Sequence, residues 1–252
     1  MSKVMTKIKK DADSCLNTFR ILTDHCPPST RSIHHTSIKI PVAASSNHDT
    51  ITPMTFDMEE LPPGDRYRIL ASLVTPRPIA WVTTQDRKNR LNAAPFSFFN
   101  VFGSNPPIVA FAPGNKDHHT PKDTARNIRE TGEFVVHMVD EPLGKVMVAT
   151  SASLPHGENE LDLHNLTTLP SEKISVPRIA EAPVALECTA HSTIEIGSNR
   201  LIIGIVHFVH VREGIMDEKG YHQEGQYHPL ARMASPDWYS RTTDQFEIPR
   251  PD

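Results

Sequence analysis

The chain has 252 residues, of which 38% are hydrophobic and 22% are charged, and its formal net charge is −4 at pH 7. This slight excess of acid gives no reason to expect nucleic acid or an anionic membrane as a partner. No run of about 18 apolar residues predicts a membrane span. The odd number of cysteines, none in a CxxC pair, argues against a secreted disulfide framework. We therefore expect a cytoplasmic protein.

Residues 1–52 differ in composition from the remainder. They are rich in Ser, Thr, His, Lys and Pro, and they show no sustained hydrophobic periodicity. The basic and hydroxyl residues are similar to those of a mitochondrial transit peptide, but Asp11, Asp13 and Asp24 weaken that interpretation. We predict a disordered extension over residues 1–52 and one folded domain over residues 53–252.

The first half of the folded region predicts extended segments. Residues 62–64, Pro-Pro-Gly, indicate a turn. β-Branched and aromatic residues predict a strand over residues 79–84, and a polar loop leads from it into a second extended stretch beginning at Leu91. The two prolines within residues 105–107 break the chain before a third strand at residues 108–112. This succession of short strands favours an antiparallel sheet.

The second half combines strands with short helices. Asp123 or Thr124 is expected to cap a helix that ends at Gly132. Cys188 falls within a later apolar strand and is expected to be a buried thiol. Since strict alternation of strands and helices is missing, we predict a mainly β fold, a closed antiparallel β-barrel with peripheral helices. The remaining predicted elements are a strand at 133–139, helices at 141–149 and 158–163, and a hairpin of strands at 184–196 and 200–211.

Residues 92–100, Asn-Ala-Ala-Pro-Phe-Ser-Phe-Phe-Asn, form the most distinctive stretch. They combine small residues, aromatic rings and uncharged hydrogen-bonding groups, without an acid, a base or a cysteine. Such a surface suits a flat organic ring with polar edges, because Asn and Ser can donate to ring carbonyls while Ala and Pro allow close approach. The alternative is a strand whose alternate aromatic residues face the core and whose others form a subunit contact.

Lys122-Asp123-Thr124 is the second candidate binding motif. A helix start presents free backbone N–H groups and a partial positive charge, to which Lys122 adds a cation and Thr124 a hydroxyl. These groups together could hold a phosphate. The alternative is an ordinary helix start with a solvated lysine. Considered together, the ring site and the phosphate site suggest a mononucleotide cofactor.

Other chemistries are less well supported by the sequence. Trp81 is interpreted as a core residue, with a cofactor contact as the alternative. The histidines at 118–119, 222 and 228 lack the spacing of a metal site, so we expect none. No G-x-S-x-G elbow, P-loop or G-x-G-x-x-G is present, which weighs against a hydrolase, an NTPase and a Rossmann domain.

A series of short motifs runs in one order along residues 54–250. It resembles the flavin reductase-like, FMN-binding split-barrel family, and the order of many motifs makes the resemblance specific. One departure is Arg232-Met233-Ala234, where the family commonly has Arg-Leu-Gly. The motifs are Pro76-Arg77-Pro78 with 79–84, 92–100, Ser104-Asn105-Pro106-Pro107, Lys122-Asp123-Thr124 with Asn127-Ile128, 133–137, 150–152, 155–157, Glu160-Leu161, 182–188, and Pro229-Leu230-Ala231-Arg232.

The resemblance implies a Greek-key split barrel that forms a homodimer, with FMN bound non-covalently at the interface. It implies an oxidoreductase that transfers a hydride from NAD(P)H through the flavin to a small-molecule substrate, because the cofactor carries the chemistry. A non-catalytic FMN-binding dimeric module is the alternative, and no residue is assigned as catalytic. The residues expected to contact the cofactor are Asn92, Ala93, Pro95, Ser97, Phe98 and Asn100, with Lys122, Asp123, Thr124 and Asn127 at its phosphate or ring.

Overall fold

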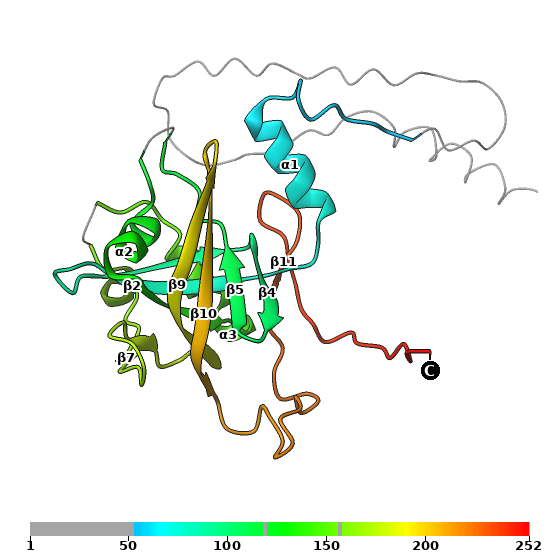
Figure 1. Cartoon of the computed structure of the whole chain (residues 1–252). Coiled ribbons are helices and arrows are strands. Elements are labelled where there is room, and N and C mark those ends of the chain that lie inside the picture. Colours follow the sequence, from blue (N-terminus) through cyan, green and yellow to red (C-terminus); the bar gives the residue numbers. More distant parts are fainter. Residues whose placement is uncertain (1–52, 118–119, 156–157, 252) are drawn as a thin grey trace, which may run out of the picture. The chain divides into compact units, whose positions relative to one another are not determined.

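Seven strands form one antiparallel sheet in the order β3-β2-β6-β9-β10-β5-β4 (Figure 1). The computed structural model describes residues 53–117, 120–155 and 158–251, and the unit considered below is Thr55–Asp252. The predictions for residues 1–52 and for His118-His119 lie outside the described residues. The strands are β2 (Ala80–Gln85), β3 (Leu91–Phe96), β4 (Phe99–Ser104), β5 (Pro107–Phe111), β6 (Glu133–Met138), β9 (Val184–Ile196) and β10 (Asn199–Val211).

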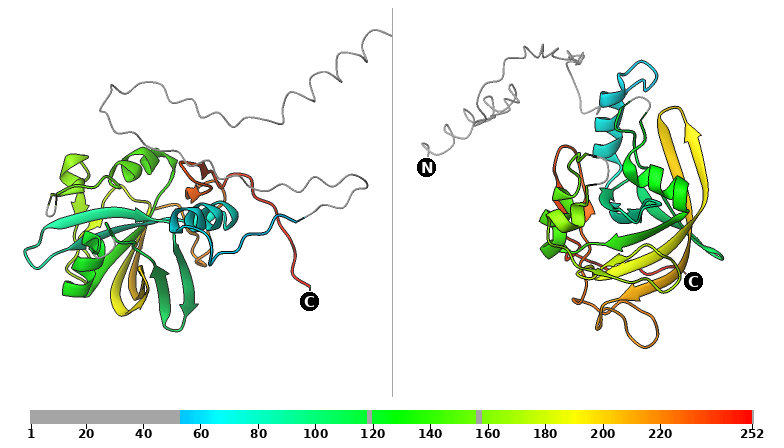
Figure 2. Two further views of the ribbon diagram at one scale, coloured as in Figure 1. Left: turned by 90° about the horizontal axis from the view of Figure 1, so that it is seen from above. Right: turned by 90° about the vertical axis from the view of Figure 1, so that its left-hand side faces the viewer.

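The connection between β3 and β4 closes this sheet into a barrel. These two strands lie at opposite ends of the strand order, yet only Ser97 and Phe98 separate them in the chain. Because a residue spans at most about 3.6 Å, the end of β3 and the start of β4 are at most about 11 Å apart. The sheet therefore curls, as both views in Figure 2 show, and the barrel is split where β3 passes into β4.

The barrel has a buried layer on each face of β2 and β3. Side chains alternate across a strand, so Ala80 and Val82 face an inner cluster with Phe111 and Phe134, whereas Trp81 belongs to an outer cluster. Helix α2 (Asp123–Thr131) contributes Ala125 and Ile128 to the inner cluster. Helices α3 (Glu141–Ala149) and α4 (Glu160–Leu163) contribute Met147 and Leu161 to the outer cluster.

The β9–β10 hairpin has a close contact that requires glycine. At Gly204 an added Cβ would lie 2.4 Å from Cζ of Phe134, so the phenyl ring occupies the space that a side chain would need. Phe134 is fully buried. The buried thiol of Cys188 lies in the same inner cluster, as the sequence predicts, and burial together with the neighbouring Glu187 raises its pKa.

The helix boundaries differ from the sequence expectation at three places, one of which is α4, which begins at Glu160 and not at residue 158. The predicted turn at Pro62 and Pro63 opens helix α1 (Pro63–Leu73), because a proline is well accommodated in the first turn of a helix. Lys122 occupies the N-cap position of helix α2 without capping it through its side chain, and Asp123 and Thr124, the expected caps, lie inside the first turn. Gly132 ends α2 in the left-handed region with φ 76°, as predicted.

Five two-residue strands complete the described secondary structure. A three-stranded sheet joins β1 (Arg77–Pro78), β11 (Ala231–Arg232) and β12 (Tyr239–Ser240), and β7 (Thr168–Leu169) pairs with β8 (Arg178–Ile179). Strands this short show no periodicity, so the sequence did not predict them. The predicted class, a mainly β antiparallel barrel with peripheral helices, is confirmed. Within the described ranges, no helix is long and apolar enough to cross a membrane.

Candidate functional site

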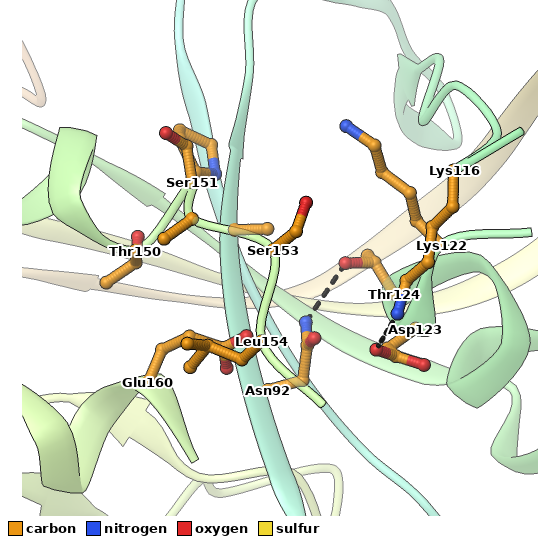
Figure 3. Close-up of a pocket in the computed structure, with 13 residues that line it drawn as sticks. Asn92, Lys116, Lys122, Asp123, Thr124, Thr150, Ser151, Ser153, Leu154 and Glu160 are labelled. Carbon is orange, nitrogen blue, oxygen red and sulfur yellow. Dashed lines mark hydrogen bonds and ion pairs between the residues drawn. The ribbon is translucent and has the colours of Figure 1, made fainter. Parts of the chain in front are cut away.

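A polar hollow lies between β3, the start of α2 and the segment that follows α3 (Figure 3). Its cavity volume is about 70 Å³, which is below the range of about 300–1,000 Å³ typical of small-molecule sites, so it could enclose only part of a ligand. In Figure 3, Lys116, Lys122 and Thr124 approach it from one side, and Ser151 and Ser153 from the other. We call it the Lys122 hollow. Its other lining residues are Asn92, Ala94, Pro95, Asp123, Thr150, Ala152, Leu154 and Glu160.

The first turn of α2 supplies hydrogen-bond donors to this hollow. The side chain of the cap residue, Lys122, makes no capping hydrogen bond, so the first backbone N–H groups of the helix have no side-chain acceptor there. The amide Nδ2 of Asn92 donates to Oγ1 of Thr124 at 3.0 Å, which fixes this helix start against β3. An uncapped helix start beside a hollow favours an anionic ligand.

The charges around this helix start leave one ammonium group unpaired. Asp123 pairs with Lys116 at 2.8 Å and with Arg126 at 3.3 Å. Lys122 forms no salt bridge with a described residue, and its Nζ lies 5.7 Å from the ring centroid of Phe96. Desolvation, together with the nearby ammonium of Lys116, lowers the pKa of Lys122. The Lys122 hollow therefore offers an exposed cation that has no counter-ion among the described residues.

The opposite wall is positioned by Trp81 and Glu160. Nε1 of Trp81 donates to Oγ1 of Thr150 at 2.9 Å, and that hydroxyl donates to the carbonyl oxygen of Met147, which fixes the start of the segment bearing Ser151 and Ser153. Glu160 is only 7% exposed, and its Oε2 accepts a hydrogen bond from the backbone N–H of Ala93 at 3.0 Å. Burial raises the pKa of this carboxyl group.

Asn127 carries an unmet hydrogen-bond acceptor beside the hollow. Its Nδ2 donates to Oγ1 of Thr84 at 3.1 Å, whereas its buried Oδ1 has no partner among the described residues. Asn127 borders a small cavity that shares Asn92 and Asp123 with the Lys122 hollow. A donor, such as a water molecule, is needed there, because buried polar atoms are normally hydrogen-bonded.

The structure gathers half of the predicted site residues in this hollow. Asn92, Pro95, Lys122, Asp123 and Thr124 line it together. The other five predicted residues lie elsewhere: Ala93 in the outer cluster, Ser97 and Phe98 at neighbouring hollows that also reach Pro95, Asn100 exposed on β4, and Asn127 on the buried face of α2.

The aromatic stretch is divided between the core and the surface, and its contact with a flat ring stays a prediction. Phe96 and Phe99 are buried in the inner cluster, whereas Phe98 is 42% exposed. Oδ1 of Asn100 accepts a hydrogen bond from the backbone N–H of Val101. Two of the three aromatic residues, one on β3 and one on β4, thus face the core, and the third is exposed between these strands.

Sequence reasoning missed the second wall of the hollow. Lys116, Ser151, Ser153 and Glu160 line it but were not predicted as site residues. Residues 150–152 and Glu160 did belong to the motifs of the family resemblance. The family resemblance therefore included these residues, but it did not predict that the fold would bring them opposite α2.

Comparison with known proteins agrees with this architecture. The family described as "Flavin reductase like domain" matches residues 72–231. The chain belongs to the flavin reductase-like family. An uncharacterised protein from Deinococcus radiodurans is 40% identical over 201 residues, which cover 77% of this chain and 88% of that one. This flavin reductase-like chain is thus a member of a group of flavin-related oxidoreductases.

Solved structures show the same fold. Nitrilotriacetate monooxygenase component B from Bacillus cereus is 34% identical, with a TM-score of 0.75 over 79% of this chain and 100% of that one. 2-Nitrobenzoate 2-nitroreductase from Pseudomonas fluorescens is also 34% identical, with a TM-score of 0.72 over 79% of this chain and 96% of that one. A split-barrel protein described as a putative flavin reductase, from Shewanella frigidimarina, shares the fold at 20% identity and a TM-score of 0.68, covering 79% and 100%. The flavin reductase-like chain is therefore a split barrel.

Proposed function

We propose that this protein binds FMN non-covalently in the Lys122 hollow and acts as an FMN-dependent oxidoreductase with NAD(P)H as electron donor. The observation that carries the proposal is the unpaired ammonium group of Lys122 at the uncapped start of α2. A phosphate monoester is the part of FMN that fits there, since helix N-termini and lysines both favour phosphate.

The remaining lining fits the polar edge of a flavin ring. Asn92, Ser151 and Ser153 present amide and hydroxyl groups, and Pro95 offers an apolar surface on the same lining. Few ionisable groups are needed, because the bound flavin would itself supply the hydride-accepting ring. The chain's own residues would bind the phosphate, orient the ring and limit access of water.

The names of two related proteins support an oxidoreductase. One is component B of nitrilotriacetate monooxygenase and the other is a 2-nitrobenzoate 2-nitroreductase. Both names concern redox reactions of small organic molecules. We extend this class of reaction, with a small-molecule substrate, to the present chain.

We further propose a homodimer in which the cofactor lies at the interface. Val101 and Phe102, on the edge strand β4, are exposed large hydrophobic residues, as is Phe98 just before them. Contiguous exposed apolar residues favour a protein contact. Light scattering should give twice the chain mass, and a monomer that binds FMN fully would contradict the interface position.

Two measurements test the proposed function. The purified protein is incubated with FMN, freed of unbound flavin and examined by visible absorption, and a yellow stoichiometric complex is expected. Anaerobic addition of NADH or NADPH should then bleach the flavin band. A protein that retains no FMN would refute the proposal. Bound FMN that neither nicotinamide reduces faster than free FMN would instead favour a non-catalytic binding module.

A further inference from the structure

A second hollow lies next to the Lys122 hollow and shares Pro95 and Ser151 with it. Its other lining includes Tyr67 of α1, Ser97, Arg232 of β11 and Tyr239 of β12. We call it the Arg232 hollow. The C-terminal strands and α1 contribute to this second hollow and not to the first. A ligand here would lie beside one held in the Lys122 hollow.

Arg232, which lines this hollow, lies opposite a second arginine, Arg77. Arg77 and Arg232 are directly paired in the register of β1 and β11, and residues opposite each other in an antiparallel pair point to the same face. Neither arginine forms a salt bridge with a described residue. The pKa of Arg77 is lowered, mainly by burial, and Arg232 lowers it further. Two neighbouring positive charges without a salt-bridge partner among the described residues favour the binding of an anion.

The two arginines differ in how fully their donors are used. Arg77 is buried, and it donates to the carbonyl oxygens of Ala71, Val74 and Met233, which tie the end of α1 to β11. Among the described residues, Arg232 donates only to Oη of Tyr239 and to the carbonyl oxygen of Pro236. A guanidinium group has five N–H donors in a planar fork, so Arg232 keeps donors for a ligand whereas Arg77 is structural.

The rest of the lining suits a flat ring. Tyr67 and Tyr239 contribute aromatic surface, and Ile79 and Met147 contribute aliphatic surface. The guanidinium carbon of Arg232 lies 4.8 Å from the ring centroid of Tyr239, so that aromatic ring and cation are already stacked. Asp237 also lines the hollow but is exposed. Neither Met233 nor Ala234, which depart from the family pattern, is among the described lining residues.

We infer that the Arg232 hollow binds the second substrate of the protein, an aromatic carboxylate whose carboxylate group pairs with Arg232 and whose ring contacts the aromatic lining. The planar fork of arginine matches a carboxylate in two parallel hydrogen bonds. This inference rests on the proposed function, because the neighbouring Lys122 hollow would hold the flavin that reacts with this substrate.

Calorimetric titration of the FMN-loaded full chain with benzoate and with benzamide tests the inference. The two probes differ in charge but hardly in shape, so we expect benzoate to bind about tenfold more tightly. Arg232→Met should abolish that preference while leaving the Kd for FMN unchanged. Arg129→Met, which alters an exposed arginine on α2, should leave both values unchanged. Tyr67→Leu should weaken benzoate and benzamide alike, and it tests the ring contact independently if the Arg232 variant fails to fold.

Three results would overturn the inference. Equal binding of benzoate and benzamide to the wild-type chain would show that no cation of the protein pairs with the carboxylate of the ligand. Unaltered benzoate preference in Arg232→Met would place the anion elsewhere. A loss of FMN binding but not of riboflavin binding in Arg232→Met would show that this arginine holds the cofactor's phosphate. Failure of the proposed function is distinguishable, because it appears as a wild-type chain that takes up no FMN whether or not benzoate binds.

Discussion

Buried polar groups of β6 and β9 are hydrogen-bonded more completely than the groups at the Lys122 hollow, where Lys122 itself is exposed. His137 is fully buried, and its Nδ1 donates to the carbonyl oxygen of Trp81 while its Nε2 accepts from the N–H of Ile179. Glu187 is fully buried as well. Its carboxylate accepts from Nε2 of His210 and from the N–H groups of Glu172 and Lys173.

The groups at the hollow are not satisfied in this way. Lys122 has no described carboxylate partner, Oδ1 of Asn127 has no described donor, and burial raises the pKa of Glu160. By contrast, burial alone would raise the pKa of Glu187, but its hydrogen bonds lower that pKa overall. Polar groups whose hydrogen bonds are all made within the protein indicate a role in stability. Polar groups in a hollow that lack such partners indicate a place for a ligand.

The largest effect on stability is expected at His137. His137→Phe keeps the ring shape but leaves the carbonyl of Trp81 and the N–H of Ile179 without partners. Each unsatisfied buried group costs about 1–3 kcal/mol, so the free energy of unfolding should fall by about 2–6 kcal/mol. Urea denaturation measures this loss. His191→Phe, at an exposed histidine, is the control. An equal loss of unfolding free energy in both variants would show that the hydrogen bonds of His137 do not contribute specifically to stability.

Acid should destabilise the protein through the same residue. Burial lowers the pKa of His137 from 6.5 to about 4, so the unfolded chain binds a proton more readily between these values. The stability that the neutral imidazole provides is therefore present above pH 6.5 and is lost as the pH falls towards 4. This difference in pKa corresponds to about 3 kcal/mol. Denaturation midpoints of the wild type should fall over that range, and His137→Phe should show a flatter profile.

At the hollow, Lys122→Met should change binding and not folding. Removing a charged partner of a phosphate costs about 1.5–3 kcal/mol, which is a rise of about 10-fold to 100-fold in the Kd for FMN. The unfolding free energy should change by less than about 0.5 kcal/mol. Lys145→Met alters an exposed lysine of α3 and should leave the Kd unchanged. If Lys122→Met lost as much unfolding free energy as His137→Phe, Lys122 would have a structural role and not a binding role.

Glu160→Gln should have the smallest effect and a distinct pH dependence. Because the folded pKa is raised above the ordinary 4.5, the native state holds its proton more strongly than the unfolded chain. Wild-type stability from this group is present below about pH 4.5 and is lost as the pH rises towards the raised pKa. Glutamine can still accept from the N–H of Ala93. The variant should therefore gain stability relative to wild type as the pH rises above about 4.5, and a loss of stability relative to wild type would contradict this prediction.

The sequence predicted six of the seven strands of the large sheet and helices α2, α3 and α4 because their signals are local, but it missed β4 and α1. Helix α3 (Glu141–Ala149) matches its predicted range, and the β9–β10 hairpin differs by one residue at one end. Helix α1 was missed because only Asp65 and Ala71 of it are buried, which leaves little apolar periodicity. The two-residue strands were missed because they depend on partners far away in sequence, such as Arg77 with Arg232.

The candidate site was predictable on one wall only. Asn92 and Lys122 carry local signals, an amide in a small-residue stretch and a cation at a helix start. Glu160 looks like an ordinary helical glutamate in the sequence, and it becomes a site residue only because α4 packs on β3 and buries its carboxyl group. A property that depends on burial, such as the raised pKa of this carboxyl group, follows from the tertiary fold. It cannot be predicted from composition or from the spacing of residues.

The central claim is that the Lys122 hollow binds a phosphate-bearing flavin. Fluorescence titration of the flavin-free wild-type chain with FMN and with riboflavin tests it most directly, because the two ligands differ only in the phosphate. The structure predicts that FMN binds at least about tenfold more tightly than riboflavin, which lacks the group expected to pair with Lys122. Equal affinities, or no quenching by either ligand, would contradict the claim.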